Sequence, residues 1–224
     1  MFLGHFAMAL AAKKAAPQAS LGLYVLAAQW ADALWPALLL TGSEQVKIDP
    51  GNTPVTPLDF VHYPISHSLA TTIGWGVAFG AAVFAFTRNR AASLVSVFLV
   101  VSHWLLDWIS HRPDLPIMPA DTAKQGLGLW NSVPATMVVE FGFLGFGVWL
   151  YLSCTKPKDR VGIWGMWSFI AALALIYLAN LTSPPPSVSA IAWAGLIGTV
   201  LIVAWTIWID RHRAPSDPPV QVSA

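Results

Sequence analysis

Six apolar stretches dominate the sequence, and each is about as long as the segment that a helix needs to cross a membrane. A helical span takes about 20 mostly apolar residues. The apolar runs are continuous rather than alternating, which favours helices over membrane strands. We expect spans at residues 20–41, 66–87, 91–110, 132–152, 161–182 and 187–209. The pattern therefore predicts an all-α fold, a polytopic membrane bundle of about six transmembrane helices.

The composition excludes several other classes of protein. Only 10% of the residues are charged, whereas soluble domains carry about 25%, so a soluble globular enzyme is excluded. The 12 Trp and 11 Phe residues exclude a disordered chain. A net charge of +1 provides no basic surface for a nucleic acid. The single cysteine excludes an internal disulfide framework and a cysteine-rich zinc site.

The segments before the first span and after the last span are not themselves expected to cross the membrane. Residues 2–16 are apolar and end in Lys13 and Lys14, which is the reverse of the order in a signal peptide. Their apolar part is too short to cross the membrane, so we expect a short half-membrane helix that turns back at Pro17. Residues 211–224 are polar and contain proline. We expect a single transmembrane domain at 1–210 and a disordered cytoplasmic tail at 211–224.

The distribution of Lys and Arg predicts the orientation, because cytoplasmic loops collect these residues. With the N-terminus inside, nine of them lie on inner segments and only Lys47, Arg112 and Lys124 lie outside. Both termini are therefore expected in the cytoplasm. The outer loops at 42–65 and 111–131 are long and contain several prolines, and long loops of this kind tend to be functional. We expect the working face to point outward.

Three carboxylates lie within the expected spans, namely Asp32, Asp107 and Glu140, and no Lys or Arg accompanies them there. Ionisable groups in a bilayer are costly and usually functional. Buried carboxylates without a cationic partner cannot all stay ionised. Either they are protonated, or a cation lies among them, and a divalent metal is the simplest candidate. Five histidines lie near these acids in the expected topology: His5, His62, His67, His103 and His111.

One helix face carries the strongest signal. His103, Asp107 and His111 stand at i, i+4 and i+8 and share one side of a helix. A His and an Asp one turn apart can bind the same ion, although the same spacing also suits a structural polar stripe. His67 precedes the second span and belongs near the outer end of this helix.

Residues from other segments reach a similar depth. At a rise of 1.5 Å per residue, His5, Asp32, His103 and Glu140 all lie about 20 Å from the inner surface. Pro36 removes the helical partner of the Asp32 carbonyl, so we expect a kink there. We interpret the convergence as one metal site. The alternatives are that Asp32 is satisfied by neighbouring polar groups and that Glu140 is a protonated packing residue.

The ordered set of His5, Asp32, HYPISHS, HWLLDWISH and Glu140 resembles bacterial membrane-bound metal-dependent hydrolases of the inner membrane. More distantly, its order is similar to that of zinc-dependent phospholipase C and P1-type nucleases. The resemblance covers residues 5–140 and implies that Asp32, His67, His103 and Asp107 bind one zinc ion. It further implies that His5 and Asp107 bind another, and that His111 and Glu140 belong to a third. That family has a His four residues before this Glu, where this chain has Thr136, so two ions are expected rather than three.

We therefore expect a membrane hydrolase with two zinc ions, or ions of another divalent metal, at its outer face. Two metals about 3.5–4 Å apart activate water and stabilise phosphoryl charge. Asp107 is the expected bridge, and Asp59 or Asp32 is expected to accept a proton. Arg112, His62 and Asn131 are assigned to binding the substrate, a lipid-like phosphoester or another small molecule among the membrane lipids. The alternatives are a proton or divalent-cation transporter that uses the same residues, and a scaffold with a structural metal.

Overall fold

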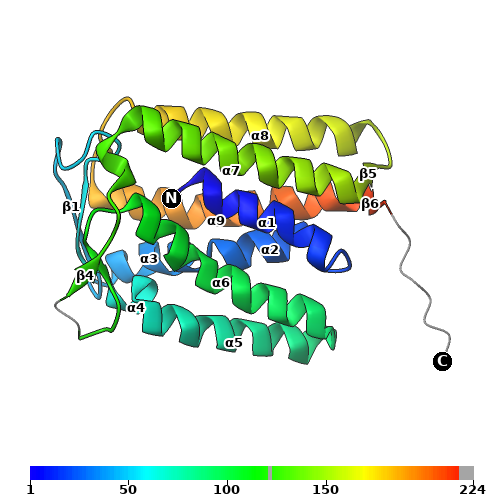
Figure 1. The fold of residues 1–224 in the computed structure, drawn as a ribbon, viewed down its shortest axis with the longest axis horizontal. Helices are drawn as coiled ribbons and strands as arrows, with labels where there is room; N and C mark the ends of the chain where they lie inside the picture. Colours follow the sequence, from blue (N-terminus) through cyan, green and yellow to red (C-terminus); the bar gives the residue numbers. More distant parts are fainter. Residues whose placement is uncertain (121–122, 217–224) are drawn as a thin grey trace.

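The computed structural model describes residues 1–120 and 123–216, which form a bundle of helices lying side by side (Figure 1). Five helices are long and apolar enough to cross a membrane, and a sixth span is added if a bent pair of shorter helices counts as one. This confirms the predicted all-α polytopic bundle and indicates a multi-pass membrane protein.

The helices are α1 (Leu3–Ala15), α2 (Leu21–Ala28), α3 (Trp30–Leu40), α4 (Pro64–His67), α5 (Leu69–Thr87), α6 (Arg90–Ser110), the 3-10 turn η1 (Leu129–Asn131), α7 (Val133–Cys154), α8 (Arg160–Asn180) and α9 (Val188–Arg211). Three short antiparallel pairs join β1 (Gln45–Ile48) to β2 (Leu58–His62), β3 (Leu115–Pro116) to β4 (Lys124–Gln125), and β5 (Thr155–Pro157) to β6 (Arg213–Pro215). The pairs β1–β2 and β3–β4 lie at one end of the bundle, and β5–β6 lies at the other (Figure 1).

The first expected span is broken. Helices α2 and α3 meet at an angle of 56°, and the break falls at Gln29 rather than at Pro36, which lies inside α3. The kink predicted from Pro36 is therefore wrong in position, and the bend occurs at Gln29 instead. At the break, the Ala28 carbonyl bonds to the His103 ring of α6 at 2.7 Å, so a side chain from another helix takes up a backbone acceptor there.

Helix α1 is short, as expected, but it lies inside the bundle. Most of its residues are buried, and its apolar side chains join the main core with Tyr24 of α2 and Phe169 of α8. Gly147 lets α7 approach closely, because a Cβ at that position would lie 2.6 Å from the Cα of Ala7. At the end of α1, the buried Lys13 donates to the carboxylate of Asp210 on α9 at 3.0 Å.

The C-terminal segment is ordered further than the sequence suggests. Strand β6 pairs with β5, and the Arg213 guanidinium donates to the Gly162 carbonyl at 2.7 Å and to Thr155. This differs from the disorder expected from residue 211, because a buried Arg with several carbonyl and hydroxyl acceptors anchors the segment. The rest of the predicted tail, residues 217–224, lies outside the described residues.

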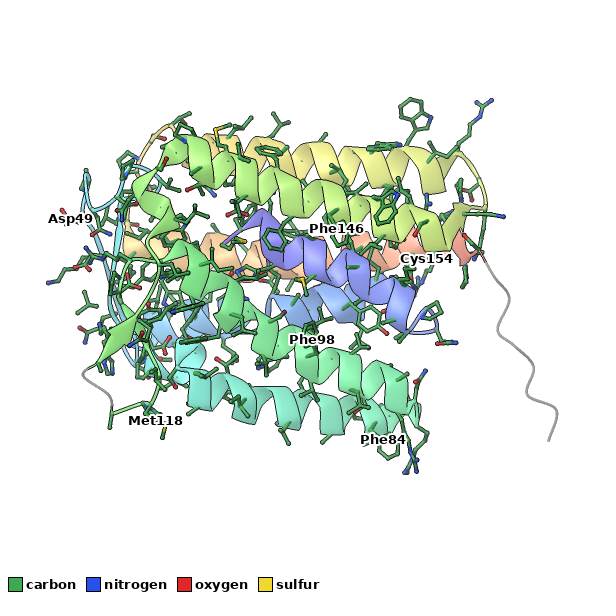
Figure 2. All side chains as sticks on the ribbon, viewed as in Figure 1. Asp49, Phe84, Phe98, Met118, Phe146 and Cys154 are labelled. Atoms are coloured by element: carbon green, nitrogen blue, oxygen red, sulfur yellow. The ribbon has the colours of Figure 1, made fainter. Side chains whose placement is uncertain are left out.

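The outer faces of the long helices are apolar. Phe98 on α6 and Phe146 on α7 are 55% and 57% exposed, as expected of side chains that face lipid (Figure 2). Between α5 and α6 the contact is close, because a Cβ at Gly80 would overlap Val97. Gly76 and Gly80 therefore serve helix packing.

Candidate metal centre

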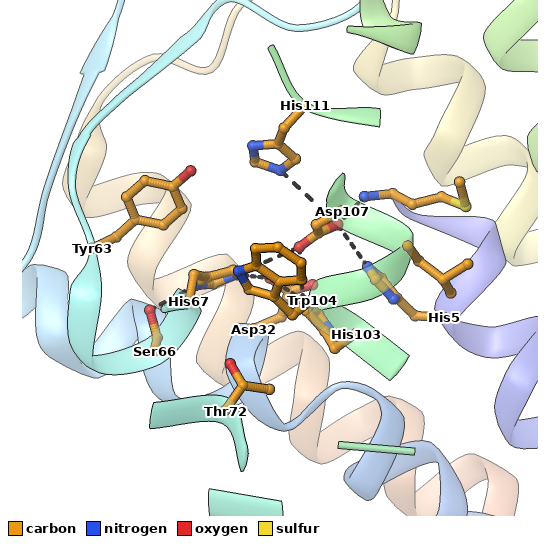
Figure 3. Close-up of polar contacts among 12 residues, drawn as sticks. His5, Asp32, Tyr63, Ser66, His67, Thr72, His103, Trp104, Asp107 and His111 are labelled. Carbon is orange, nitrogen blue, oxygen red and sulfur yellow. Dashed lines mark hydrogen bonds and ion pairs between the residues drawn. The ribbon is translucent and has the colours of Figure 1, made fainter. Parts of the chain in front are cut away.

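The centre is built around Asp107, one turn after His103 on α6. Its Oδ1 lies 3.1 Å from His5 Nε2 and 3.9 Å from His111 Nε2. Its Oδ2 lies 3.2 Å from His103 Nε2 and 3.9 Å from His67 Nε2. Each carboxylate oxygen thus faces a different pair of imidazoles, which is the arrangement of a bridging ligand (Figure 3).

Asp32 of α3 closes one side of this cluster. Its Oδ1 lies 3.5 Å from His67 Nε2 and 3.7 Å from His103 Nε2. The side chain of Asp32 is 42% exposed, whereas the side chains of His67, His103 and Asp107 are at most 4% exposed. Asp32 is therefore the acid that a molecule from outside the cluster can reach.

Two groups of three residues can each hold a metal ion. One consists of His5, His103 and Asp107, and the other of Asp32, His67 and His103. Within each group the ligand atoms lie within 4.8 Å of one another. Imidazole nitrogens and carboxylate oxygens are the ligands that zinc accepts in proteins. The structure thus brings together five of the seven predicted ligands in two groups that share His103. Because His103 has only Nε2 free, it can complete one of these groups at a time, and a second ion would depend on Asp107 Oδ1 with His5 and His111.

Hydrogen bonds orient two of the imidazoles. His103 donates its Nδ1–H to the Ala28 carbonyl at 2.7 Å, because a carbonyl can only accept. Ser66 donates its hydroxyl to the buried Glu44 carboxylate at 2.6 Å, so its oxygen accepts from His67 Nδ1 at 2.6 Å. In both rings Nε2 points into the cluster, and in the neutral imidazole it carries the lone pair that a metal ion binds. Metal-binding histidines are held in this way by their other nitrogen.

His111 is oriented by the same device. Its Nδ1 lies 2.9 Å from Asp114 Oδ1, which also accepts from the Tyr63 hydroxyl at 2.8 Å. Burial lowers the pKa of His111, although the bond to Asp114 opposes this shift, and a neutral imidazole is the form that binds metals. Burial and the Asp114 carboxylate raise the pKa of Tyr63, so its hydroxyl remains a donor.

The centre contains buried nitrogens without partners. Among the described residues, neither His5 Nδ1 nor His103 Nε2 has a hydrogen-bond partner. The rings of His5 and His103 stack with centroids 3.7 Å apart. His103 Nε2 faces the Asp107 carboxylate at 3.2 Å. If the ring is neutral with its proton on Nδ1, the Nε2 lone pair and the carboxylate repel each other unless a cation lies between them, whereas an imidazolium would pair with Asp107 directly. A metal ion fits this arrangement.

Glu140 takes a different role from the expected one. Its carboxylate accepts from the backbone N–H groups of Phe2 at 2.8 Å and Gly4 at 3.0 Å. The first N–H groups of a helix lack partners within it, so Glu140 caps α1, and it belongs to neither metal group. Nearby, the amino group of Met1 contacts Asp107. Glu140 and His111 both line the cavity described below, but no candidate metal group among the described residues pairs them.

The other predicted residues lie at the rim. The Asp59 carboxylate on β2 pairs with the Arg112 guanidinium, and Arg112 Nε also lies 3.4 Å from Asp114. His62 is exposed and faces Gln45 in the β1–β2 hairpin. Asn131, at the end of η1, is exposed as well. None of Asp59, Arg112, His62 and Asn131 lines the cavity described below.

The sequence did not point to three supporting residues. Glu44 lies far from His67 along the chain, and only the fold brings its carboxylate to Ser66. The Ala28 carbonyl could not be found from sequence, because any residue type offers one. Asp114 carried a weak signal, since it follows His111 by three residues.

A cavity of about 630 Å³ adjoins the centre. Four residues of the cluster lie in its wall: Asp32, His67, Asp107 and His111. The remaining walls are mostly apolar and come chiefly from α1, α2, α3, α8, α9 and the β1–β2 hairpin, and Glu140 of α7 also lines the cavity. Its volume lies within the ~300–1,000 Å³ typical of ligand sites.

Comparisons of this chain with protein-family models, with curated proteins and with solved structures find no match.

Proposed function

We propose that the protein is an integral-membrane metal-dependent hydrolase that holds two divalent ions, zinc by its ligand set, and cleaves a lipid-like phosphoester. One observation carries the proposal. His103 Nε2 and Asp107 Oδ2 face each other 3.2 Å apart, Nε2 has no hydrogen-bond partner among the described residues, and each Asp107 oxygen faces its own pair of imidazoles. The Met1 amino group contacts Asp107 Oδ1, and a divalent ion between Oδ2 and His103 Nε2 would balance the other side; in the proposed two-ion state a second ion takes the Oδ1 side in place of the amino group.

The chemistry follows from this ligand set. A pair of bound divalent ions supplies an activated water and stabilises charge on a phosphoryl group. Asp107 holds the two halves of the site together. Asp32 is the exposed acid and is suited to accept a proton at the substrate. Asp59, the other predicted acceptor, is less suited because Arg112 neutralises it.

A proton or divalent-cation transporter remains the alternative, and the interior of the bundle argues against it. A transporter requires polar groups on both sides of its binding site. Below His5, the buried side chains of α1 up to Lys13 include Phe6, Ala9 and Leu10, which belong to the apolar core. Lys13 itself is paired with Asp210. This supports a site that substrate reaches from one side of the membrane only.

The proposed setting is the bacterial inner membrane, with both termini in the cytoplasm and the centre toward the outer face. The nine-to-three division of Lys and Arg supports this orientation. His67 ends α4, which follows β2 directly, and His111 follows the end of α6, shortly before β3. The centre therefore lies toward the end of the bundle that carries β1–β2 and β3–β4, which is the end formed by the long predicted outer loops.

Metal content and hydrolysis test the proposal together. Protein purified in mild detergent should contain about two zinc ions per chain, and should hydrolyse a p-nitrophenyl alkyl phosphodiester. Asp107→Asn should lose both the metal and the activity, while Asp49→Asn in the exposed loop should keep them. Protein that stays free of metal after incubation with zinc would overturn the proposal. Metal binding with cation flux in vesicles but no hydrolysis would favour the transporter.

A further inference from the structure

The cavity lies where α8 and α9 move apart. Near one end these helices touch, since a Cβ at Gly165 would lie 3.2 Å from the Trp208 ring, and the rings of Phe169 and Trp205 are 5.6 Å apart. Toward their other ends, Tyr177 of α8 and Gly198 of α9 both line the cavity. The space is thus a wedge between two spanning helices that opens toward the metal centre.

The α9 wall of the wedge is long. Cavity-lining residues run from Ala190 to Val203, a distance of about 20 Å along the helix. This is close to the thickness of one leaflet, about half of the ~30 Å hydrocarbon core. A Cβ at Gly198 would meet no atom within 4 Å, whereas one at Gly195 would lie 2.6 Å from the Pro36 ring. Gly198 therefore faces open space.

Polar atoms without partners occur in the same cavity wall. Among the described residues, Trp35 Nε1, Tyr177 OH and Gln29 Oε1 have no hydrogen-bond partner, although these residues are only 8%, 4% and 9% exposed. Buried polar groups are nearly always paired. Gln29 and Trp35 flank Asp32 in the sequence, so their atoms suit the polar end of a bound molecule rather than its chain.

We infer that the wedge binds a single acyl chain of the substrate, with the polar end of that molecule at the metal centre and the chain along α9. The inference rests on the proposed function for the nature of the polar end. The lining is mostly apolar and about as long as a leaflet is deep, which fits an alkyl chain better than a polar solute. Gly198, which has no side chain, would then leave room for the chain beside α9.

Binding of two alkyl phosphates tests this inference. We expect the zinc-loaded protein to bind hexadecyl phosphate at least tenfold more tightly than octyl phosphate at matched detergent concentration. Gly198→Leu should remove most of this preference and leave octyl phosphate binding unchanged. Gly145→Leu is the matched control, because Gly145 is an exposed helix glycine with no atom within 4 Å of its Cβ position. Ala194→Phe provides a second variant in the cavity wall.

The outcomes separate this inference from the proposed function. Equal binding of both phosphates by the unaltered protein, or an unchanged preference in Gly198→Leu and Ala194→Phe, would overturn the acyl-chain site. If the preference for the long chain persists in metal-free protein that also lacks hydrolysis, the chain site stands while the hydrolase proposal fails. A loss of preference in Gly145→Leu would mean that the detergent, not the cavity, sets it.

Discussion

Ser66 contacts the candidate metal centre only through His67 Nδ1 and is not itself a proposed ligand, so its removal tests the proposed ligand geometry. Its hydroxyl links the Glu44 carboxylate to His67 Nδ1, with both contacts at 2.6 Å. In Ser66→Ala, His67 loses the acceptor that keeps its proton on Nδ1 and its Nε2 toward Asp32. Loss of such a supporting group costs about 10–100-fold in metal affinity, which is about 1.4–2.8 kcal/mol.

Ser102→Ala is the matched control. Ser66 and Ser102 are both buried, and each directly precedes a histidine of the centre. The Ser102 hydroxyl, however, bonds to the Leu99 carbonyl of its own helix at 2.8 Å. Zinc affinity, measured by competition with a chelator in detergent, should fall in Ser66→Ala and stay unchanged in Ser102→Ala. Equal affinities in the two variants would refute the orienting role of the Glu44–Ser66–His67 chain.

Three further predictions concern the bundle. Glu140→Ala leaves N–H groups at the start of α1 unpaired, so the free energy of unfolding should fall by about 1–3 kcal/mol. Metal analysis of this variant should find an unchanged zinc content. Loss of an ion would instead show that Glu140 is a metal ligand, as the sequence predicted. Gly80→Leu forces α5 away from Val97 and should lower the free energy of unfolding, measured by thermal unfolding, by about 1–3 kcal/mol. Gly74→Leu, where a Cβ meets open space, should lower it much less. Equal losses of stability in the two variants would contradict the packing role of Gly80. A reporter fused after Ala224 should read as cytoplasmic, and a periplasmic signal would reverse the orientation.

Most of the helical scaffold could be predicted because each long span is a continuous apolar run. The ends of α5 to α9 fall within a few residues of the expected bounds. The bend at Gln29 could not be predicted, since Pro36 is the stronger local signal and remains within a helix. What stabilises the bend is a contact with His103, and such contacts between distant helices leave no local pattern.

The candidate site was partly predictable for a similar reason. His103, Asp107 and His111 follow helical spacing, and the depth estimate correctly brought His5 and Asp32 toward them. The same estimate placed Glu140 at that depth, but depth does not specify the partner. A carboxylate in a membrane can bind a cation or accept hydrogen bonds from the free N–H groups at the start of a helix. Glu140 accepts such bonds at the start of α1. The partners of the outer residues Asp59 and Arg112 depend on how the loops fold.

The clamping of α1 at both ends has a consequence for biogenesis. Its start is held by Glu140 of α7, and its end by Asp210 of α9, the last helix that the structure describes. A ribosome releases α1 first, yet both clamps emerge much later. His5 can therefore settle beside Asp107 only when translation has passed α9. Zinc loading would then mark chains whose synthesis has run through the whole bundle, and unfinished chains would carry an open, incomplete centre.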